Sequence, residues 1–357
     1  LPTDGWGEKD GVVTNSERRI SRQKSFLTSP GEATPDWWQL CEVAKRMGFG
    51  QAFDFAGPWE IFAEYAASTA LGNNGARDLD VSGLSTLDRA AFDALEPLQW
   101  PYLAGAERQE TRFFAEGHFY TPDRRANFIA TPYRAPMAGL SADFPLRMNT
   151  GRIRDQWHTM TRTARTSRLM SHMGEPYVEI HPSDAIRNGL QSADLARVQS
   201  AHGSAILRVV VTKRQPEGAV CTAMHWTDQF ASQGRIGALI ESHRDPVSGQ
   251  PELKHSAVRV TRFAPAWYGF AVMTRRPDTS AFAYAAASPA KGGWRLEFAL
   301  SETPETWELL AAELLSSETC EAPELLSYLD NNRGLYRFAA FDGNRCHGVL
   351  FIGTEPV

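Results

Sequence analysis

Residues 149–163 read NTGRIRDQWHTMTRT and follow the short extended run FPLRM at 144–148. A glycine at a strand end lets backbone N–H groups approach an anion closely, and arginine forks match phosphate oxygens two bonds at a time. Between residues 150 and 168, five arginines are interleaved with five hydroxyl side chains: Arg152, Arg154, Arg162, Arg165 and Arg168, with Thr150, Thr159, Thr161, Thr163 and Ser167. Gln156, Trp157 and His158 add groups that suit a flat heterocycle. The stretch predicts either a site for a phosphate-bearing, ring-containing ligand or a basic surface loop.

The same stretch resembles the dinucleotide-binding signature in the last domain of the molybdopterin oxidoreductases. Its QWHTMTRT form is most similar to the assimilatory nitrate reductases. Four companion motifs follow in the family's order: GWGEKDGVVTNSERRISRQ at 5–23, QWP at 99–101, MHWT at 224–227 and DPVSGQPELKHSAVRV at 245–260. The resemblance runs from Leu1 to about Val260 and continues more weakly to the end.

The resemblance implies a cofactor, bis-molybdopterin guanine dinucleotide with molybdenum, held partly by this chain. The expected cofactor-binding residues are Thr150, Gly151, Arg152, Ile153, Arg154, Gln156, Trp157, His158, Thr159, Trp226, Gly237 and Lys254. Trp226 could instead pack in the core, and Lys254 could simply be solvated. Gly237 stands where the family usually has asparagine, so it offers only backbone. The resemblance places the iron–sulfur cluster and the residue nearest molybdenum in the parent enzyme but outside this segment, so we expect no catalytic residue or metal ligand here.

For the parent enzyme, the resemblance implies reduction of nitrate to nitrite in the cytoplasm. The electron donor is expected to be ferredoxin, flavodoxin or an NADH-linked reductase subunit. The alternatives are another molybdopterin guanine dinucleotide enzyme, such as a formate dehydrogenase, and a non-catalytic nucleotide-binding barrel module. The sequence begins at Leu1, and we read it as a carboxyl-terminal piece that does not reduce nitrate by itself.

Composition narrows the class of protein. The chain has 357 residues, a net charge of −5 and 42% hydrophobic residues, which is ordinary for a globular protein and argues against nucleic-acid binding. No apolar run approaches the roughly 18 residues of a membrane helix, and no signal peptide is recognised. The four cysteines form no C-x-x-C pair, so we expect buried thiols in a reducing compartment, with Cys320 and Cys346 as packing residues. The sequence has no P-loop, nucleophile elbow or zinc motif, so a hydrolase or NTPase lacks support.

The pattern predicts a mixed α/β protein in three parts. Residues 1–143 are expected to form the last part of the α/β core of the parent enzyme, with a hairpin near 12–20. The resemblance places Glu8, Asn15 and Arg18, in and beside this hairpin, near the pterin. Helices are expected at 34–48, capped by Thr34, then from Pro58, and at 85–94, capped by Ser85 or Thr86.

From 144 to about 262 the pattern changes to short strands, spaced as in a closed β-barrel. The resemblance specifies a six-stranded double-psi β-barrel for this domain, which binds the dinucleotide. Residues 263–357 are expected to form a small α+β extension. Its predicted elements are strands around 263–272, helices at 306–315 and 322–329, and a hairpin that turns at 342–344.

Overall fold

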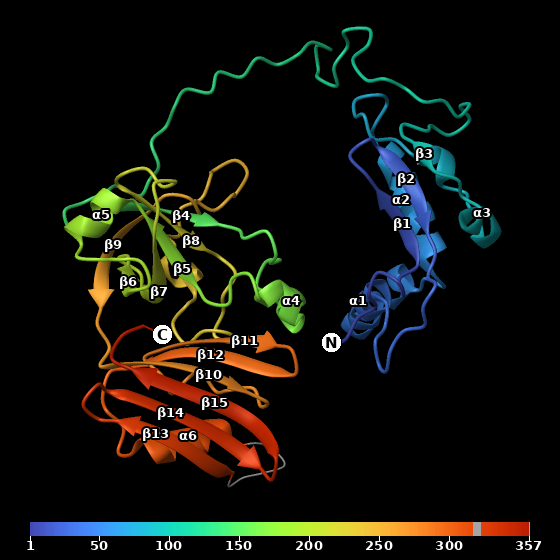
Figure 1. Cartoon of the computed structure of the whole chain (residues 1–357). Coiled ribbons are helices and arrows are strands. Elements are labelled where there is room, and N and C mark those ends of the chain that lie inside the picture. The colour runs from blue at the N-terminus through green and yellow to red at the C-terminus, as the bar shows by residue number, and fades with distance from the viewer. Residues whose placement is uncertain (317–322, 357) are drawn as a thin grey trace. The chain divides into compact units, whose positions relative to one another are not determined.

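The structure is a computed structural model that describes residues 1–316 and 323–356 (Figure 1). The chain divides into two compact units, Leu1–Pro132 and Tyr133–Val357. Cys320 lies outside the described residues. In the part that is described, no helix is long and apolar enough to cross a membrane.

The first unit is built on a small sheet. Strands β1 (Gly11–Thr14) and β2 (Arg19–Gln23) form the predicted antiparallel hairpin, and β3 (Leu98–Gln99) pairs with β2. Its core gathers Phe62 and Ala66 of helix α2 (Pro58–Ala70) with Ile20 of the hairpin. Helix α2 begins at Pro58 as predicted, because proline has no N–H to lose at the first helical position.

The hairpin turn is held by its own polar side chains. Asn15 Oδ1 accepts hydrogen bonds from the N–H groups of Glu17 and Arg19 at 3.0 and 3.1 Å. Arg18 adopts a φ of 62°, and its guanidinium donates to the Trp100 carbonyl at 2.6 Å. The same guanidinium lies 3.6 Å from the ring centroid of Phe113. The described contacts of Arg18 are therefore with the protein itself, and its proximity to a pterin stays a prediction.

Two helix starts differ from prediction. Helix α1 spans Asp36–Ala44 with Pro35 as its N-cap residue, and no side chain caps it. The Thr34 Oγ1 accepts instead from the side chain of Gln39, with Nε2 at 2.9 Å. A π turn at Lys45–Phe49 follows the helix, and Gly48 reverses the backbone there at a φ of 94°. Helix α3 is only Arg89–Asp93, and its cap is Asp88, which accepts from the Ala91 N–H at 2.8 Å.

The second unit contains a closed six-stranded barrel, which confirms the predicted fold class. Its order is β4-β8-β5-β7-β6-β9. The strands are β4 (Leu146–Gly151), β5 (Tyr177–Ile180), β6 (Leu195–Gln199), β7 (Ser204–Val211), β8 (Ala219–Ala223) and β9 (Ser256–Phe263). The β4–β8 and β5–β7 pairs are parallel, and the remaining pairs are antiparallel. The predicted short helix is present as α5 (Pro182–Arg187).

The extension is a six-stranded antiparallel sheet in the order β11-β12-β10-β15-β14-β13 (Figure 1). Its elements are β10 (Trp267–Met273), β11 (Tyr284–Ala290), β12 (Gly293–Leu300), α6 (Trp307–Leu315), β13 (Glu324–Asp330), β14 (Leu335–Asp342) and β15 (Arg345–Gly353). Helix α6 packs on one face through Ala311, Leu314 and Leu315. Tyr284, Ala286 and Ala299, on the other face, pack against the barrel's loops.

The prediction of a helix at 322–329 is wrong over its described part. Residues Glu324–Asp330 form β13, which pairs along its whole length with β14. Backbone pairing with β14 decides the structure here, although the leucines of this segment also suit a helix. The β11–β12 hairpin was not predicted. The expected strands around 263–272, the helix at 306–315 and the hairpin at 342–344 correspond to β10, α6 and β14–β15.

Candidate functional site

Strand register brings the distant motifs to one end of the barrel. Gly151, the last residue of β4, pairs with Ala223, the last residue of its parallel neighbour β8. Strand β9 runs antiparallel to β4 and starts beside it, with Ser256 opposite Met148. The loop after β4, the loop after β8 and the segment before β9 must therefore leave the barrel together. These are the segments that carry the residues predicted to bind the cofactor.

Direct contacts join Lys254 to the start of the motif. The Thr150 hydroxyl donates to the Leu253 carbonyl at 2.9 Å. The Lys254 ammonium donates to the Thr150 backbone carbonyl and lies 3.2 Å from the Thr150 hydroxyl. These residues are 104 positions apart in the sequence. Lys254 therefore places a positive charge beside the strand end that precedes Arg152.

Gly151 allows β4 and β8 to approach closely. A Cβ atom built on this glycine would lie 3.1 Å from Cys221 Sγ. That separation is tighter than an ordinary contact, so a larger residue would crowd the Cys221 side chain of the neighbouring strand. Burial raises the pKa of the Cys221 thiol, which favours the uncharged form. The role of Gly151 in the structure is close packing at the point where the chain enters the loop.

His225 organises the loop, and the sequence analysis did not select it. It is fully buried, at 0% exposure, two residues after the end of β8. Its Nε2 accepts from the Ile153 N–H at 2.9 Å, and its Nδ1 donates to the His158 carbonyl at 2.6 Å. This pattern requires the neutral ring protonated on Nδ1. Burial lowers the pKa of His225, and the charge of Arg152 acts in the same direction.

Other residues of the motif also face inward. The Gln156 side chain is buried, donates to the Leu169 carbonyl at 3.1 Å and accepts from the Thr163 hydroxyl at 2.6 Å. Met160 is fully buried at a φ of 62°, and Ile153 packs against the same hydrophobic cluster. The loop is therefore a fixed structure, and the amide of Gln156 is used to hold it.

The remaining motif residues face outward. Arg152, Trp157, His158 and Thr159 are exposed, with Trp157 at 61%. The Trp157 and His158 rings stand edge to face at 4.5 Å between centroids, and His158 has a φ of 43°. Within residues 1–316 and 323–356, the Arg152 side chain has no hydrogen bond or ion pair. Its guanidinium is available to an anion.

Arg154 has a different neighbour. Its Nε donates to Asp155 Oδ1 at 3.1 Å, and His172 Nδ1 lies 2.6 Å from Asp155 Oδ2. The hydrogen bond from Arg154 is the main cause of the lowered pKa of Asp155. Because Arg154 already has a carboxylate partner, it is less free than Arg152 to bind phosphate.

Two predicted contacts have contrasting surroundings. Trp226 is only 1% exposed and lies in the hydrophobic cluster between the barrel loops and the extension. The structure thus places its indole in the core, which was the alternative stated for it, and leaves no ring face open to a ligand. Gly237 lies exposed in a short 3-10 turn, Ile236–Leu239, and nothing occupies the space where its side chain would be.

The exposed side chains of Arg152, Lys254, Trp157 and His158 suit a molybdopterin dinucleotide. A fork-shaped guanidinium and an ammonium match pyrophosphate oxygens, while an exposed indole and imidazole suit ring systems. In the described ranges no group of three or more His, Cys, Asp or Glu side chains could hold a metal ion. The residues present therefore fit the organic part of such a cofactor.

Comparison with known families agrees with this chemistry. Residues 146–257 match the Molydopterin dinucleotide binding domain, and residues 1–46 match the Molybdopterin oxidoreductase family. A nitrate reductase of Klebsiella oxytoca is 38% identical over an alignment that covers 98% of this chain and 43% of that protein. This chain belongs to the molybdopterin oxidoreductase family. It spans less than half the length of that relative.

Other relatives within the family differ in activity. An F420-dependent formate dehydrogenase 1 subunit alpha of Methanococcus maripaludis is 30% identical, covering 73% of this chain and 36% of that protein. Acetylene Hydratase from Pelobacter acetylenicus shares the fold, with a TM-score of 0.54 and 17% identity over 74% of this chain and 38% of its own. The sequence relatives are thus named for two different reactions, and the acetylene hydratase shows a shared fold alone.

Proposed function

We propose that this chain is the cofactor-binding carboxyl-terminal part of a molybdenum nitrate reductase, and that it holds bis-molybdopterin guanine dinucleotide at the loop end of its barrel. The observation that carries the proposal is that His225 holds the loop backbone from the buried side, which leaves the other side chains of the motif exposed. Buried hydrogen bonds fix the loop backbone, while Arg152, Trp157 and Thr159 remain exposed. A site prepared in this way binds without first ordering its own loop.

Most of the predicted residues have a distinct task in this proposal. Arg152 binds a pyrophosphate oxygen pair, and the Lys254 ammonium adds positive charge at the neighbouring strand end. Trp157 and His158 flank a ring, and Thr159 offers a hydroxyl. Gly151, Ile153 and Gln156 act through the loop they hold, and Gly237 contributes backbone only.

The cofactor, when bound, supplies the redox chemistry at molybdenum. The parent reaction converts nitrate to nitrite and water with two electrons and two protons. We assign the electron supply to ferredoxin, flavodoxin or an NADH-linked subunit in the cytoplasm, and an iron–sulfur cluster to the parent outside this segment. The identity to nitrate reductases supports this substrate. The formate dehydrogenase relatives support the second candidate, formate oxidation.

Activity assays separate the two candidates. The enzyme that contains this chain is purified and assayed with reduced viologen and nitrate, and in parallel with formate and oxidised viologen. We expect nitrite formation and no formate oxidation. Formate oxidation without nitrite formation would contradict the proposed substrate. The chain 1–357 alone should give no nitrite, and molybdenum-dependent turnover by it would contradict its assignment as a cofactor-binding part.

A further inference from the structure

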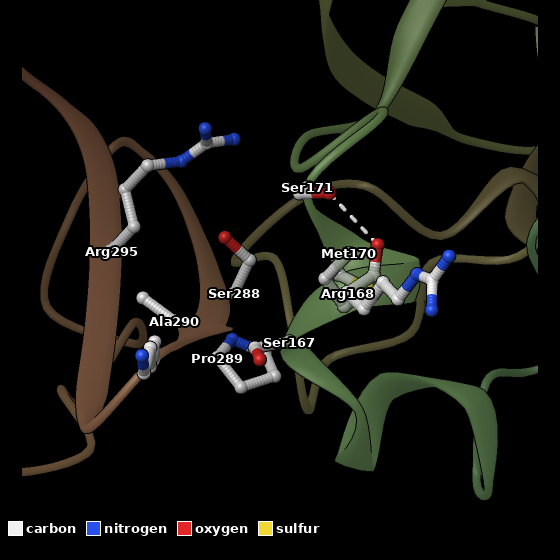
Figure 2. A pocket seen from close by; sticks show the side chains of 9 residues that line it. Ser167, Arg168, Met170, Ser171, Ser288, Pro289, Ala290 and Arg295 are labelled. Carbon is white, nitrogen blue, oxygen red and sulfur yellow. Dashed lines mark hydrogen bonds between the residues drawn. The ribbon is translucent and has the colours of Figure 1, made fainter.

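A second candidate binding site lies in the pocket between helix α4 (Ser167–Met170) and the β11–β12 hairpin, shown in Figure 2. The cavity volume is about 340 Å³. The cationic side chains among its lining residues are Arg168, Lys291 and Arg295, and the hydroxyls are those of Ser167, Ser171 and Ser288. None of the lining residues is acidic. Such a lining favours an anion.

Arg295 and Ser288 form one wall of the pocket. They are paired across β12 and β11 in register, so their side chains share one face of the sheet. Figure 2 shows the Arg295 guanidinium and the Ser288 hydroxyl extending into the space beside α4. The Arg168 guanidinium points away from the two strands, so Arg295 is the arginine available to a ligand here.

Gly174 lies in contact with the Arg295 guanidinium. A Cβ atom at this position would lie 1.7 Å from Arg295 Nη2 and 3.2 Å from Ser288 Oγ. The guanidinium therefore lies directly against the bare backbone of Gly174, beside the hydroxyl. In the described part of the chain, Arg295 has no hydrogen bond or ion pair. A half-buried guanidinium without a protein acceptor is costly unless a solvent or ligand acceptor meets it.

The acidic residue on the same strand face does not fully neutralise this wall. Glu297 lies two residues from Arg295 on β12, and burial raises its pKa to about 7, with a further contribution from Glu175. Its carboxyl is therefore largely uncharged in mildly acidic solution. The pocket keeps a net positive charge of its own.

We propose that this pocket binds a tetrahedral oxyanion of the phosphate class, either free or as the phosphoryl group of a small metabolite. The Arg295 fork and the hydroxyls of Ser288 and Ser167 match an anion with several oxygens, and Lys291 adds charge. The Ser171 hydroxyl donates instead to the Arg168 carbonyl at 2.8 Å. Half of the site belongs to the extension, outside the matched dinucleotide-binding domain. The proposal rests mainly on Arg295 and Ser288 of the extension and uses none of the side chains assigned above to the dinucleotide.

Calorimetry on the purified protein at constant ionic strength tests the proposal, with inorganic phosphate and adenosine monophosphate as probes. We expect saturable binding of at least one probe, weakened about tenfold or more by Arg295→Ala. Arg295→Lys should recover part of the affinity. Tighter binding of inorganic phosphate would identify the free anion as the ligand, and tighter binding of the nucleotide would identify a phosphorylated metabolite.

Arg345→Ala, an exposed arginine outside this pocket, is the matched control and should leave the affinity unchanged. Ser288→Ala offers a milder change if Arg295→Ala fails to fold, and it should weaken binding by severalfold. Absence of saturable binding, or equal losses in the Arg295 and Arg345 variants, would overturn the proposal. Molybdenum and guanine content should not change in Arg295→Ala, which separates this site from the barrel end.

Discussion

The inward and outward sides of the loop after β4 differ in what their polar groups do. On the inward side, His225 and Gln156 are buried and form hydrogen bonds with the loop itself. On the outward side, Arg152, Trp157 and Thr159 are exposed. Side chains that could all bind a ligand therefore have separate roles, because a buried polar group must form its hydrogen bonds with the protein. Substitutions on the inward side should lower stability, and those on the outward side should lower cofactor affinity.

The largest effect is expected from His225→Ala. The substitution removes a buried ring and two hydrogen bonds and leaves the Ile153 N–H and the His158 carbonyl without their partner. We expect a loss of about 2–4 kcal/mol in the free energy of unfolding. Urea unfolding followed by tryptophan fluorescence measures the change. His202→Ala, at an exposed turn, should change stability by no more than about 0.5 kcal/mol.

The pH dependence of this difference identifies its cause. The pKa of His225 is lowered below its ordinary value of 6.5, so the unfolded chain binds the proton first as pH falls. The stability from the neutral ring is complete above 6.5 and is lost between 6.5 and the lower pKa of the folded state. The difference between the unchanged protein and His225→Ala should shrink over that range. A difference that is constant with pH would contradict the role of the neutral ring.

The stability contributed by the extension sheet should change with pH in the opposite direction, because of Glu297 on β12. Burial raises the pKa of Glu297 from 4.5 to about 7, near Glu175 and Arg208, which are joined at 3.0 Å. The unfolded carboxyl ionises first as pH rises, so stability falls between 4.5 and 7. Glu297→Gln should remove this loss and raise stability at pH 8 by about 1–3 kcal/mol. A stability difference between the unchanged protein and Glu297→Gln that is the same at pH 4 and pH 8 would show that Glu297 is not buried as described.

A smaller effect is expected from Gly151→Ala, between the two sides of the loop. The new methyl group meets Cys221 Sγ at 3.1 Å, so the Cys221 side chain or the strand that carries it must give slightly. We expect a destabilisation of about 1–2 kcal/mol in urea unfolding. The double variant with Cys221→Ala should recover most of the loss, because it removes the atom in contact. Additive losses would place the cause elsewhere.

The smallest effect on stability belongs to Gly237→Asn, on the exposed turn. No atom lies within 4 Å of the position that its Cβ would take. The free energy of unfolding should change by at most about 0.5 kcal/mol. A loss above about 1 kcal/mol in thermal or urea unfolding would show that the turn is packed more tightly than described.

Local patterns predicted the barrel but not its contacts. The strands alternate in burial, as β4 does from Leu146 to Thr150, and this period is visible in the sequence. The role of His225 depends on partners 67 and 72 residues away, which no local pattern reveals. The motif MHWT drew attention to Trp226, while the histidine beside it joins the two ends of the loop.

The β11–β12 hairpin was missed for a different reason. Strand β11 is rich in alanine and contains Pro289, features that argue against a strand. The proline is tolerated because β11 is at the edge of the sheet, where an N–H is not required on the free side. Arg295 and its pocket therefore could not be foreseen from the sequence.

Cofactor content in Arg152→Ala is the most direct test of the central claim that the outward side of the loop binds the dinucleotide. A charge-assisted contact with phosphate contributes about 1.5–3 kcal/mol, or about one to two decades in affinity. In the enzyme that contains this chain, Arg152→Ala should fold normally and lose molybdenum and guanine nucleotide per chain. Arg152→Lys should recover part, and Arg165→Ala should retain both. A folded Arg152→Ala enzyme with full cofactor would contradict the claim.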